Sequence, residues 1–308
     1  MQHYRSLNDL SLQKSWLTVG VFDGVHRGHQ KILDALSAGA HADGASAVVL
    51  TLDPHPSAVL TGKDIPMLTT PDERAELLAA HGVDVVITER FTPDLAAVSA
   101  SEFMSRLTRR LGLARLLIGY DFALGKAREG DAARLTEIGN ELKYEVEVVK
   151  AVSDESGVIS STAIRRLIGA GDVRAAAERL GHPYSLRGPV VHGDGRGRGI
   201  GFPTANIDYP AGKILPANGI YAAWAWLGDE RHPAAVNVGV RPTVKSDQII
   251  PTVEAYLLDF DRDIYGRILK LDFVNRLREE LKFPSLEELI EQIQLDVART
   301  REILSALT

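Results

Sequence analysis

The segment W-L-T-V-G-V-F-D-G-V-H-R-G-H-Q-K-I-L, residues 16–33, decides the fold of the first half of the chain. Its apolar start, residues 16–22, predicts a buried strand. Glycines interrupt the turn that follows, and apolar residues then recur at helical spacing, so we expect a helix to begin near Gly28 or His29. A strand, a glycine turn and a helix bring free backbone N–H groups and the positive end of a helix dipole together, which favours phosphate binding.

Two histidines, His26 and His29, stand three residues apart in this turn. A neutral imidazole donates hydrogen bonds to phosphate oxygens, and an imidazolium adds positive charge, so both forms suit a displacement at phosphorus. Two other interpretations compete with this one. The first is a turn with solvated histidines, and the second is a zinc site. Helical zinc ligands usually stand four residues apart, and no cysteine is present to complete such a set.

The run G-V-F-D-G-V-H-R-G-H, residues 20–29, closely resembles the nucleotidyltransferase signature of bacterial bifunctional flavin-forming enzymes. In that family one chain is both riboflavin kinase and FMN adenylyltransferase (FAD synthetase). The H-x-G-H core alone indicates only the wider nucleotidyltransferase superfamily. The longer string is more specific, and the resemblance implies that His26 and His29 are catalytic.

Composition limits the other functional classes. The chain has 308 residues, 45% hydrophobic and 25% charged, which is enough for two domains with ordinary cores. A net charge of −6 argues against general binding to nucleic acid or to an anionic membrane. No apolar run approaches the roughly 20 residues of a membrane span, and the first residues lack a signal core. With no cysteine, we expect a cytoplasmic protein. A homo-oligomer is compatible with the sequence.

The first half alternates strands and helices, which predicts a doubly wound parallel sheet with helices on both faces. Ligands of such sheets bind beyond the carboxyl ends of the strands. Further strands are expected over residues 45–52, 83–88, 115–119 and 144–149, and helices over residues 71–81, 101–111, 131–142 and 172–180.

Three more strings in this half resemble motifs of the same family. T-L-D-P-H-P, residues 51–56, contains His55, and I-G-Y-D-F-A-L-G, residues 118–125, contains Asp121. The resemblance implies that both contact nucleotide or flavin. A P-loop over residues 119–126 is excluded, because five residues rather than four separate its glycines.

The third string is I-S-S-T-A-I-R, residues 159–165. A serine here can cap the helix that follows, and Arg165 one turn later can grip a triphosphate with two hydrogen bonds. The resemblance implies that Ser161, Thr162 and Arg165 hold the phosphates of ATP and the leaving pyrophosphate.

The second half predicts an antiparallel sheet or small barrel, because strands follow one another with turns and few helices between them. A helix over residues 285–304 closes the chain. Glycine and proline near residue 183 mark the boundary, which gives domains 1–183 and 184–308. The expected strands cover residues 186–191, 221–227, 234–238, 252–258 and 268–273.

Two motifs in this half carry chemistry. H-G-D-G-R-G-R-G-I-G-F, residues 192–202, contains no G-x-G-x-x-G register, so a Rossmann site is excluded. Its arginines and glycines can wrap a polyphosphate, or form only a flexible loop. P-T-A-N, residues 203–206, offers a hydroxyl and a carboxamide two residues apart, both suited to Mg²⁺. The candidate binding residues are Gly193, Arg196, Arg198, Thr204 and Asn206.

The string G-F-P-T-A-N-I, residues 201–207, resembles the riboflavin kinase signature, which implies that Thr204 and Asn206 hold Mg-ATP. T-V-E-A-Y-L-L-D-F, residues 252–260, resembles a second kinase motif. By that resemblance Glu254 is the general base, which accepts the proton of the riboflavin ribityl hydroxyl as it attacks ATP.

The resemblance covers nearly the whole chain and implies a two-step flavin synthesis. The second domain would phosphorylate riboflavin to FMN, and the first would adenylylate FMN to FAD with release of pyrophosphate. Two alternatives stay open at this point. One is another adenylyltransferase of the superfamily, acting on pantetheine phosphate or nicotinate mononucleotide. The other is a flavin-binding regulator or carrier without turnover.

Overall fold

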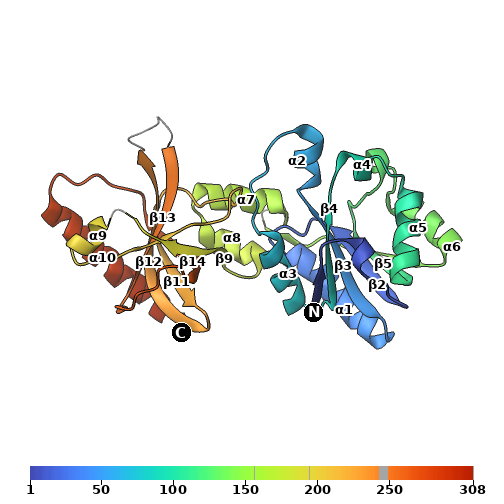
Figure 1. The fold of residues 1–308 in the computed structure, drawn as a ribbon, viewed down its shortest axis with the longest axis horizontal. Coiled ribbons are helices and arrows are strands. Elements are labelled where there is room, and N and C mark those ends of the chain that lie inside the picture. Colours follow the sequence, from blue (N-terminus) through green and yellow to red (C-terminus); the bar gives the residue numbers. More distant parts are fainter. Residues whose placement is uncertain (156, 194, 243–248, 308) are drawn as a thin grey trace. The chain divides into compact units, whose positions relative to one another are not determined.

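The computed structural model describes residues 1–155, 157–193, 195–242 and 249–307 of the chain (Figure 1). They form two compact units, Met1–Ser161 and Thr162–Thr308. Within the described ranges no helix is long and apolar enough to cross a membrane. Each unit corresponds to one of the two architectures predicted from the sequence, and each is described separately.

The first unit is built around a six-stranded sheet in which every pair of neighbouring strands is parallel. The strand order is β1-β4-β3-β2-β5-β6. The chain passes from β2 through β3 to β4 on one side and then crosses back to β5 and β6, so the order reverses at β2. The strands are β1 (Gln2–Tyr4), β2 (Ser15–Gly20), β3 (Ser46–Asp53), β4 (Val85–Arg90), β5 (Leu113–Gly119) and β6 (Glu145–Val149).

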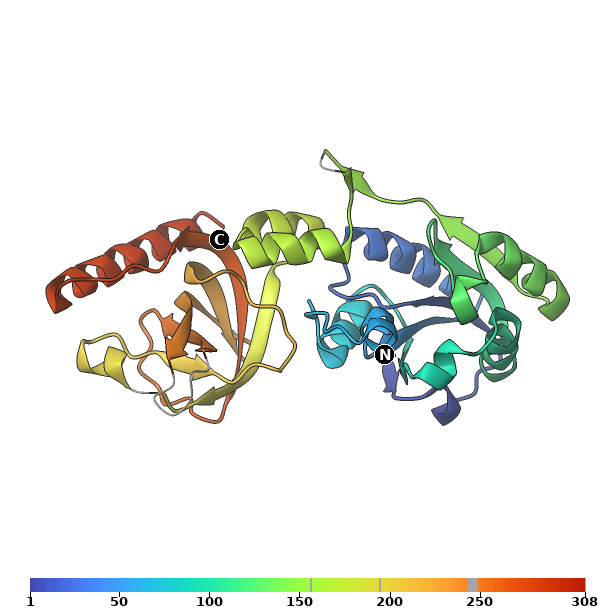
Figure 2. The same ribbon diagram turned by 90° about the horizontal axis from the view of Figure 1, so that it is seen from above.

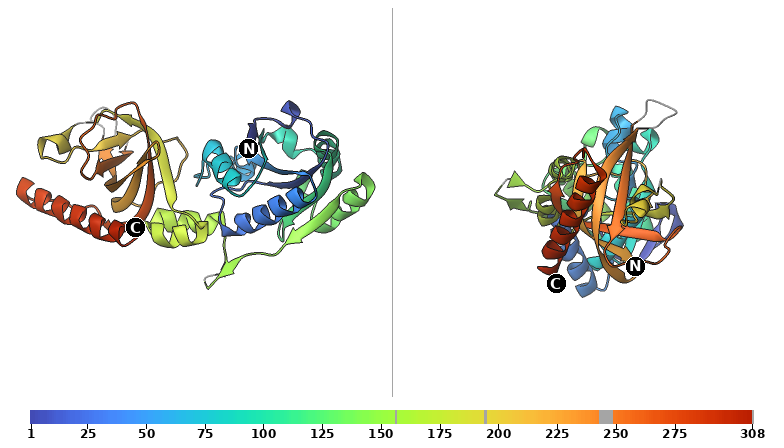
Figure 3. Two further views of the ribbon diagram at one scale, coloured as in Figure 1. Left: turned by 90° about the horizontal axis from the view of Figure 1, so that it is seen from below. Right: turned by 90° about the vertical axis from the view of Figure 1, so that its left-hand side faces the viewer.

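Helices cover both faces of this sheet, which confirms the predicted doubly wound fold (Figures 1 and 3). Most begin at a residue whose side chain accepts a hydrogen bond from the first turn; Thr70 and Glu73 form a reciprocal capping box. The helices are α1 (Arg27–Ala42), α2 (Pro56–Thr61), α3 (Pro71–Ala80), α4 (Pro93–Ala96), α5 (Ala100–Leu111) and α6 (Ala132–Leu142), with 3-10 turns η1 (Leu7–Asp9) and η2 (Lys126–Arg128) and a small hairpin of β7 (Ser153–Asp154) and β8 (Gly157–Val158).

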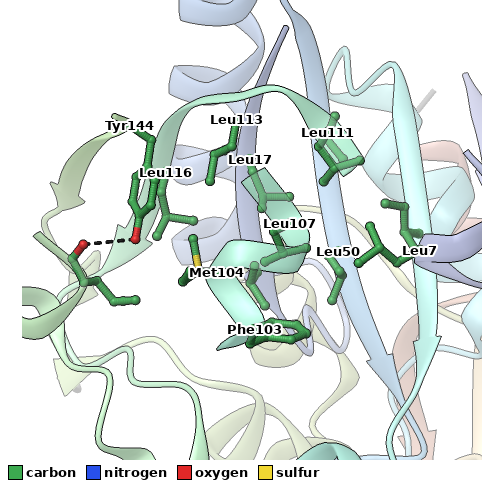
Figure 4. Packing of buried hydrophobic residues seen from close by; sticks show 14 of the residues in the cluster. Leu7, Leu17, Leu50, Phe103, Met104, Leu107, Leu111, Leu113, Leu116 and Tyr144 are labelled. Carbon is green, nitrogen blue, oxygen red and sulfur yellow. Dashed lines mark hydrogen bonds between the residues drawn. The ribbon is translucent and has the colours of Figure 1, made fainter. Parts of the chain in front are cut away.

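Two apolar layers pack against the sheet because successive side chains of a strand point to opposite faces. Trp16 of β2 belongs to the layer formed with α1 and α3, whereas Leu17 belongs to the layer formed with α5 and α6. Figure 4 shows the second layer, in which Phe103 and Leu107 of α5 lie over the sheet. The hydroxyl of Tyr144 donates a hydrogen bond of 3.0 Å to the carbonyl of Leu135 at the edge of this layer.

The second unit contains a closed antiparallel barrel with the order β10-β13-β12-β11-β14-β9 (Figure 2). This confirms the predicted β-barrel. The strands are β9 (Tyr184–Val191), β10 (Ala205–Ile207), β11 (Gly219–Leu227), β12 (Glu230–Pro242), β13 (Ile249–Leu257) and β14 (Ile268–Arg278).

Helices α7 (Ser161–Ala170) and α8 (Val173–Leu180) precede the barrel, and the short α9 (Arg196–Gly199) lies between β9 and β10. The predicted terminal helix is α10 (Leu286–Ser305), which packs against β11, β12 and β14. The guanidinium of Arg278 on β14 binds both carboxylate oxygens of Asp296 on α10, at 2.7 to 3.1 Å, and so fixes this helix to the barrel.

Candidate active sites

The loop between β2 and α1, residues 21–26, has a strained backbone. Phe22, Gly24 and Val25 have positive φ angles of 52°, 80° and 40°. This conformation is unfavourable for phenylalanine and valine, and strain of this kind clusters at functional sites. The loop leaves the carboxyl end of β2, where the strand order reverses and where sheets of this type bind their ligands.

His26 and His29 lie against each other at the first turn of α1. Their ring centroids are 3.6 Å apart, with an angle of 17° between the ring planes. Nδ1 of His26 accepts a hydrogen bond of 3.4 Å from the backbone N–H of His29, so His26 also caps the helix. A Cβ at Gly28 would lie 3.1 Å from the His26 ring, which explains the glycine between them.

The two imidazoles are neutral at pH 7. Burial lowers the pKa of His26 to about 4. Burial also lowers the pKa of His29 well below its usual value, and the neighbouring His26 and Arg74 add to this effect. Because Nδ1 of His26 is an acceptor, its proton is on Nε2. Of the two forms considered from the sequence, the site therefore favours the neutral hydrogen-bond donor over the imidazolium.

Arg74 on α3 is a buried cation beneath this loop, with a side chain only 2% exposed. It donates to the hydroxyl of Thr51 at 2.9 Å and to the carbonyl of Thr69 at 3.3 Å, and it lies 4.0 Å from a carboxylate oxygen of Asp23. Asp23 in turn accepts the backbone N–H groups of residues 68 and 69. This network joins the ends of β2 and β3 to the start of α3, and none of the sequence motifs indicates it.

A cavity of about 570 Å³ adjoins the end of β2. His55 and Asp121, predicted from two separate motifs, both lie on its wall. Nδ1 of His55 accepts from the backbone N–H of Ser57 at 3.1 Å, which fixes the histidine at the start of α2. The remaining wall is largely apolar and includes Leu52, Leu60, Phe91, Phe122 and Leu124.

Ser161 of the I-S-S-T-A-I-R motif contacts the histidine loop, since its hydroxyl donates a hydrogen bond of 2.9 Å to the carbonyl of Asp23. Thr162 and Arg165 follow on the first turn of α7 and belong to the second compact unit. The resemblance of the motif alone supports contacts of these two residues with ATP.

Three predicted residues of the second half meet on the outside of the barrel. The hydroxyl of Thr204 donates a hydrogen bond of 3.0 Å to a carboxylate oxygen of Glu254. Asn206 on β10 is the direct cross-strand partner of Glu254 on β13. The residues on either side of them along both strands are buried in the barrel, so these polar side chains face outward.

The glycine-rich loop approaches this group closely. A Cβ at Gly193 would lie 2.2 Å from Nδ2 of Asn206, so only glycine allows the approach. Arg198 lies with Thr204 on the wall of a cavity of about 480 Å³ at the end of the barrel. The side chain of Arg196 lies outside the described part of the structure.

Magnesium is compatible with the donors at this place. Among the residues that the structure describes, no three histidine or acidic side chains gather in a way that could hold a metal ion. Magnesium commonly takes one or two protein oxygens and completes its shell with water and substrate phosphates. The hydroxyl of Thr204 and the carboxamide of Asn206, next to a single carboxylate, fit that pattern better than a closed protein cage.

Two family models divide the chain between them. Residues 9–163 match the model described as FAD synthetase, and residues 180–304 match the model described as riboflavin kinase. A bifunctional riboflavin kinase/FMN adenylyltransferase from Listeria monocytogenes is 38% identical over 94% of this chain and 93% of its own length. A relative of the same name from Escherichia coli K12 is 37% identical over 93% and 91%.

The chain belongs to the bifunctional riboflavin kinase/FMN adenylyltransferase family. It carries the kinase in its C-terminal half and the adenylyltransferase in its N-terminal half. It phosphorylates riboflavin to FMN and converts FMN to FAD, with ATP as co-substrate. The presence of the kinase half argues against an adenylyltransferase for pantetheine phosphate or nicotinate mononucleotide. The presence of two catalytic domains argues against a regulator without turnover.

A solved structure is similar to this chain along nearly its whole length. It is described as a macrolide-efflux protein from Streptococcus pneumoniae, with 32% sequence identity and a TM-score of 0.88 over 97% of this chain and 98% of that one. That description applies to the Streptococcus protein, and the comparison adds that the two folds agree along nearly their full lengths.

Proposed function

We propose that the stacked pair of His26 and His29 is the catalytic centre for FAD formation. The observation that supports this most strongly is their position: two neutral imidazoles at the amino end of α1, next to the strand at which the sheet order reverses. Neutral N–H donors stabilise the charge that develops on phosphate oxygens during a displacement, and they need no proton transfer to do so. The helix dipole favours the same charge.

In the proposed reaction a phosphate oxygen of FMN attacks the α-phosphorus of ATP. The new P–O bond forms as the bond to pyrophosphate breaks, so no covalent enzyme intermediate is needed and catalysis depends on positioning. The cavity lined by Phe91 and Phe122 is apolar and large enough for the flavin ring, with His55 and Asp121 as its polar contacts. Ser161, Thr162 and Arg165 would hold the phosphates of ATP and the leaving pyrophosphate.

For the kinase we propose Glu254 as the general base. It would accept the proton of the ribityl hydroxyl while that oxygen attacks the terminal phosphorus of ATP and ADP leaves. Its position next to Thr204 and Asn206 supports this role, because those residues offer the oxygen donors for magnesium. Magnesium would neutralise charge on the phosphates, and Gly193, Arg196 and Arg198 would surround the polyphosphate.

The domain limits 1–183 and 184–308 are proposed on the same basis, since Tyr184 begins the first barrel strand. We also propose a cytoplasmic location, which the absence of cysteine and the bacterial relatives support. A homo-oligomer is compatible with this scheme.

The test uses one chain with two activities. His29→Ala should reduce FAD formation by about 10²–10³-fold, because one preformed donor is lost, and leave FMN formation unchanged. Glu254→Gln should reduce FMN formation by about 10²–10⁴-fold and leave the conversion of added FMN to FAD unchanged. Flavins are separated by chromatography after incubation with riboflavin or FMN and Mg-ATP. Equal loss of both activities in a folded variant would refute the division of labour.

A further inference from the structure

A row of three polar side chains crosses the outside of the barrel. Asn206 on β10 pairs directly with Glu254 on β13, and Glu254 pairs directly with Asn237 on β12. Directly opposed residues of antiparallel strands point to the same face with Cβ atoms about 4.5–5.5 Å apart. The next residue in the row, Ile220 on β11, is apolar, so the polar row ends at Asn237.

Asn237 differs from its neighbours in one respect. Its carboxamide oxygen is buried and has no hydrogen-bond partner within the described part of the structure. A buried acceptor without a donor costs folding free energy, and such a group needs an explanation in a native protein. Gly239 stands two residues after Asn237 on β12 and leaves room for the exposed side chain of Glu280. A Cβ at Gly239 would lie 2.3 Å from a carboxylate oxygen of Glu280 and 3.5 Å from Nδ2 of Asn237.

Glu254 occupies the middle of this row of three side chains, so it has one neighbour on β10 and another on β12. Thr204 and Asn206, the proposed magnesium and phosphate ligands, lie on one side, and Asn237 lies on the other. An alcohol that gives its proton to Glu254 must approach the same face. Riboflavin, the substrate of this domain, carries that alcohol at the end of a ribityl chain with further hydroxyl groups, each of them a hydrogen-bond donor.

We infer that Asn237 binds riboflavin, its carboxamide oxygen accepting a hydrogen bond from a ribityl hydroxyl other than the one that attacks phosphorus. This inference rests on the proposed role of Glu254. Since sites built to hydrogen-bond a substrate hydroxyl discriminate strongly against analogues that lack it, Asn237 contributes specificity for the polyol chain.

The test compares two flavins in the full-length protein. One is riboflavin, and the other carries a pentyl chain with only the terminal hydroxyl in place of the ribityl chain. Asn237→Leu keeps the number and branching of the side-chain heavy atoms and removes the acceptor. For riboflavin, the variant should lower kcat/KM about tenfold, equivalent to about 1.4 kcal/mol, and raise the dissociation constant measured by flavin fluorescence without ATP. For the single-hydroxyl flavin, the change should be less than about twofold.

Several controls keep the outcomes distinct. Asn275→Leu changes an asparagine of the same barrel outside the row, and FAD formation from added FMN monitors the other half of the chain. If Asn237→Leu does not fold, Asn237→Ala should give the same difference between the two flavins. Equal losses for both flavins, or no loss for riboflavin, would overturn the inference. Full kinase turnover of Glu254→Gln would instead overturn the proposed base, whatever Asn237 does.

Discussion

The depressed pKa of His26 predicts a defined loss of stability in acid. The pKa of this residue is about 4 in the folded protein against 6.5 for an unperturbed histidine, mainly because the ring is buried. Below pH 6.5 the unfolded chain therefore binds a proton that the folded chain does not. The folded state loses about 1.4 kcal/mol by pH 5.5, and about 3 kcal/mol once the pH falls to about 4. Above about pH 7.5, where the unfolded histidine is also neutral, this contribution is nearly constant.

His26→Asn isolates the effect, because asparagine also caps a helix but does not titrate. The difference in unfolding free energy between wild type and variant should change by about 1.4 kcal/mol between pH 7.5 and pH 5.5, in favour of the variant at the lower pH. Carboxylates that titrate in the same range contribute equally to both proteins and cancel. Urea unfolding of the full chain gives the free energy of unfolding of wild type and variant at each pH. Hydrogen exchange of peptides from α1 follows the unfolding of the first unit. A difference that stays constant with pH would refute the buried, neutral histidine.

Two further substitutions test contacts of the sites. Arg74→Met should destabilise the first unit by about 3–5 kcal/mol in urea unfolding, because Asp23 keeps a buried charge without its cation. FAD formation should fall while FMN formation continues. A stability within about 1 kcal/mol of wild type, which is the scale of an exposed ion pair, would contradict the network. Gly193→Ala should reduce FMN formation alone, because its methyl group would lie 2.2 Å from Nδ2 of Asn206. Gly199→Ala in the same loop meets no atom of the described residues within 4 Å and should remain active in the same chromatographic assay.

Most of the fold was predictable because its signals are local. The helix after the H-x-G-H string begins at Arg27, within two residues of the expected position, since the capping histidine and the apolar spacing lie in the same short stretch. Thr70 and Ser285 likewise cap two of the helices expected from the sequence. Strand β1 was not predicted, because its three residues show no apolar alternation and it exists only by pairing with β4, more than eighty residues away.

The supporting residues of the sites could not be predicted in the same way. Arg74 stands on a helix among charged residues, where the sequence pattern favours exposure, and its partners at positions 23, 51 and 69 come from three other segments. Asn237 sits between two valines of a strand, which predicts an outward polar side chain but not its pairing with Glu254. Both roles depend on strand register and loop packing, and these are set by contacts distant in sequence.

Because both histidines are neutral, they bring no positive charge to balance the phosphates of a substrate in the first site. The sequence allowed an imidazolium pair, which would have supplied two positive charges. The fold instead buries both rings, so a proton added to either ring would meet desolvation, and at His29 it would also meet repulsion from the cationic Arg74. Two neutral donors and the end of α1 stabilise developing charge but do not balance the full charge of a triphosphate. That balance must come from cations elsewhere, and the proposed phosphate contact of Arg165 is suited to supply part of it.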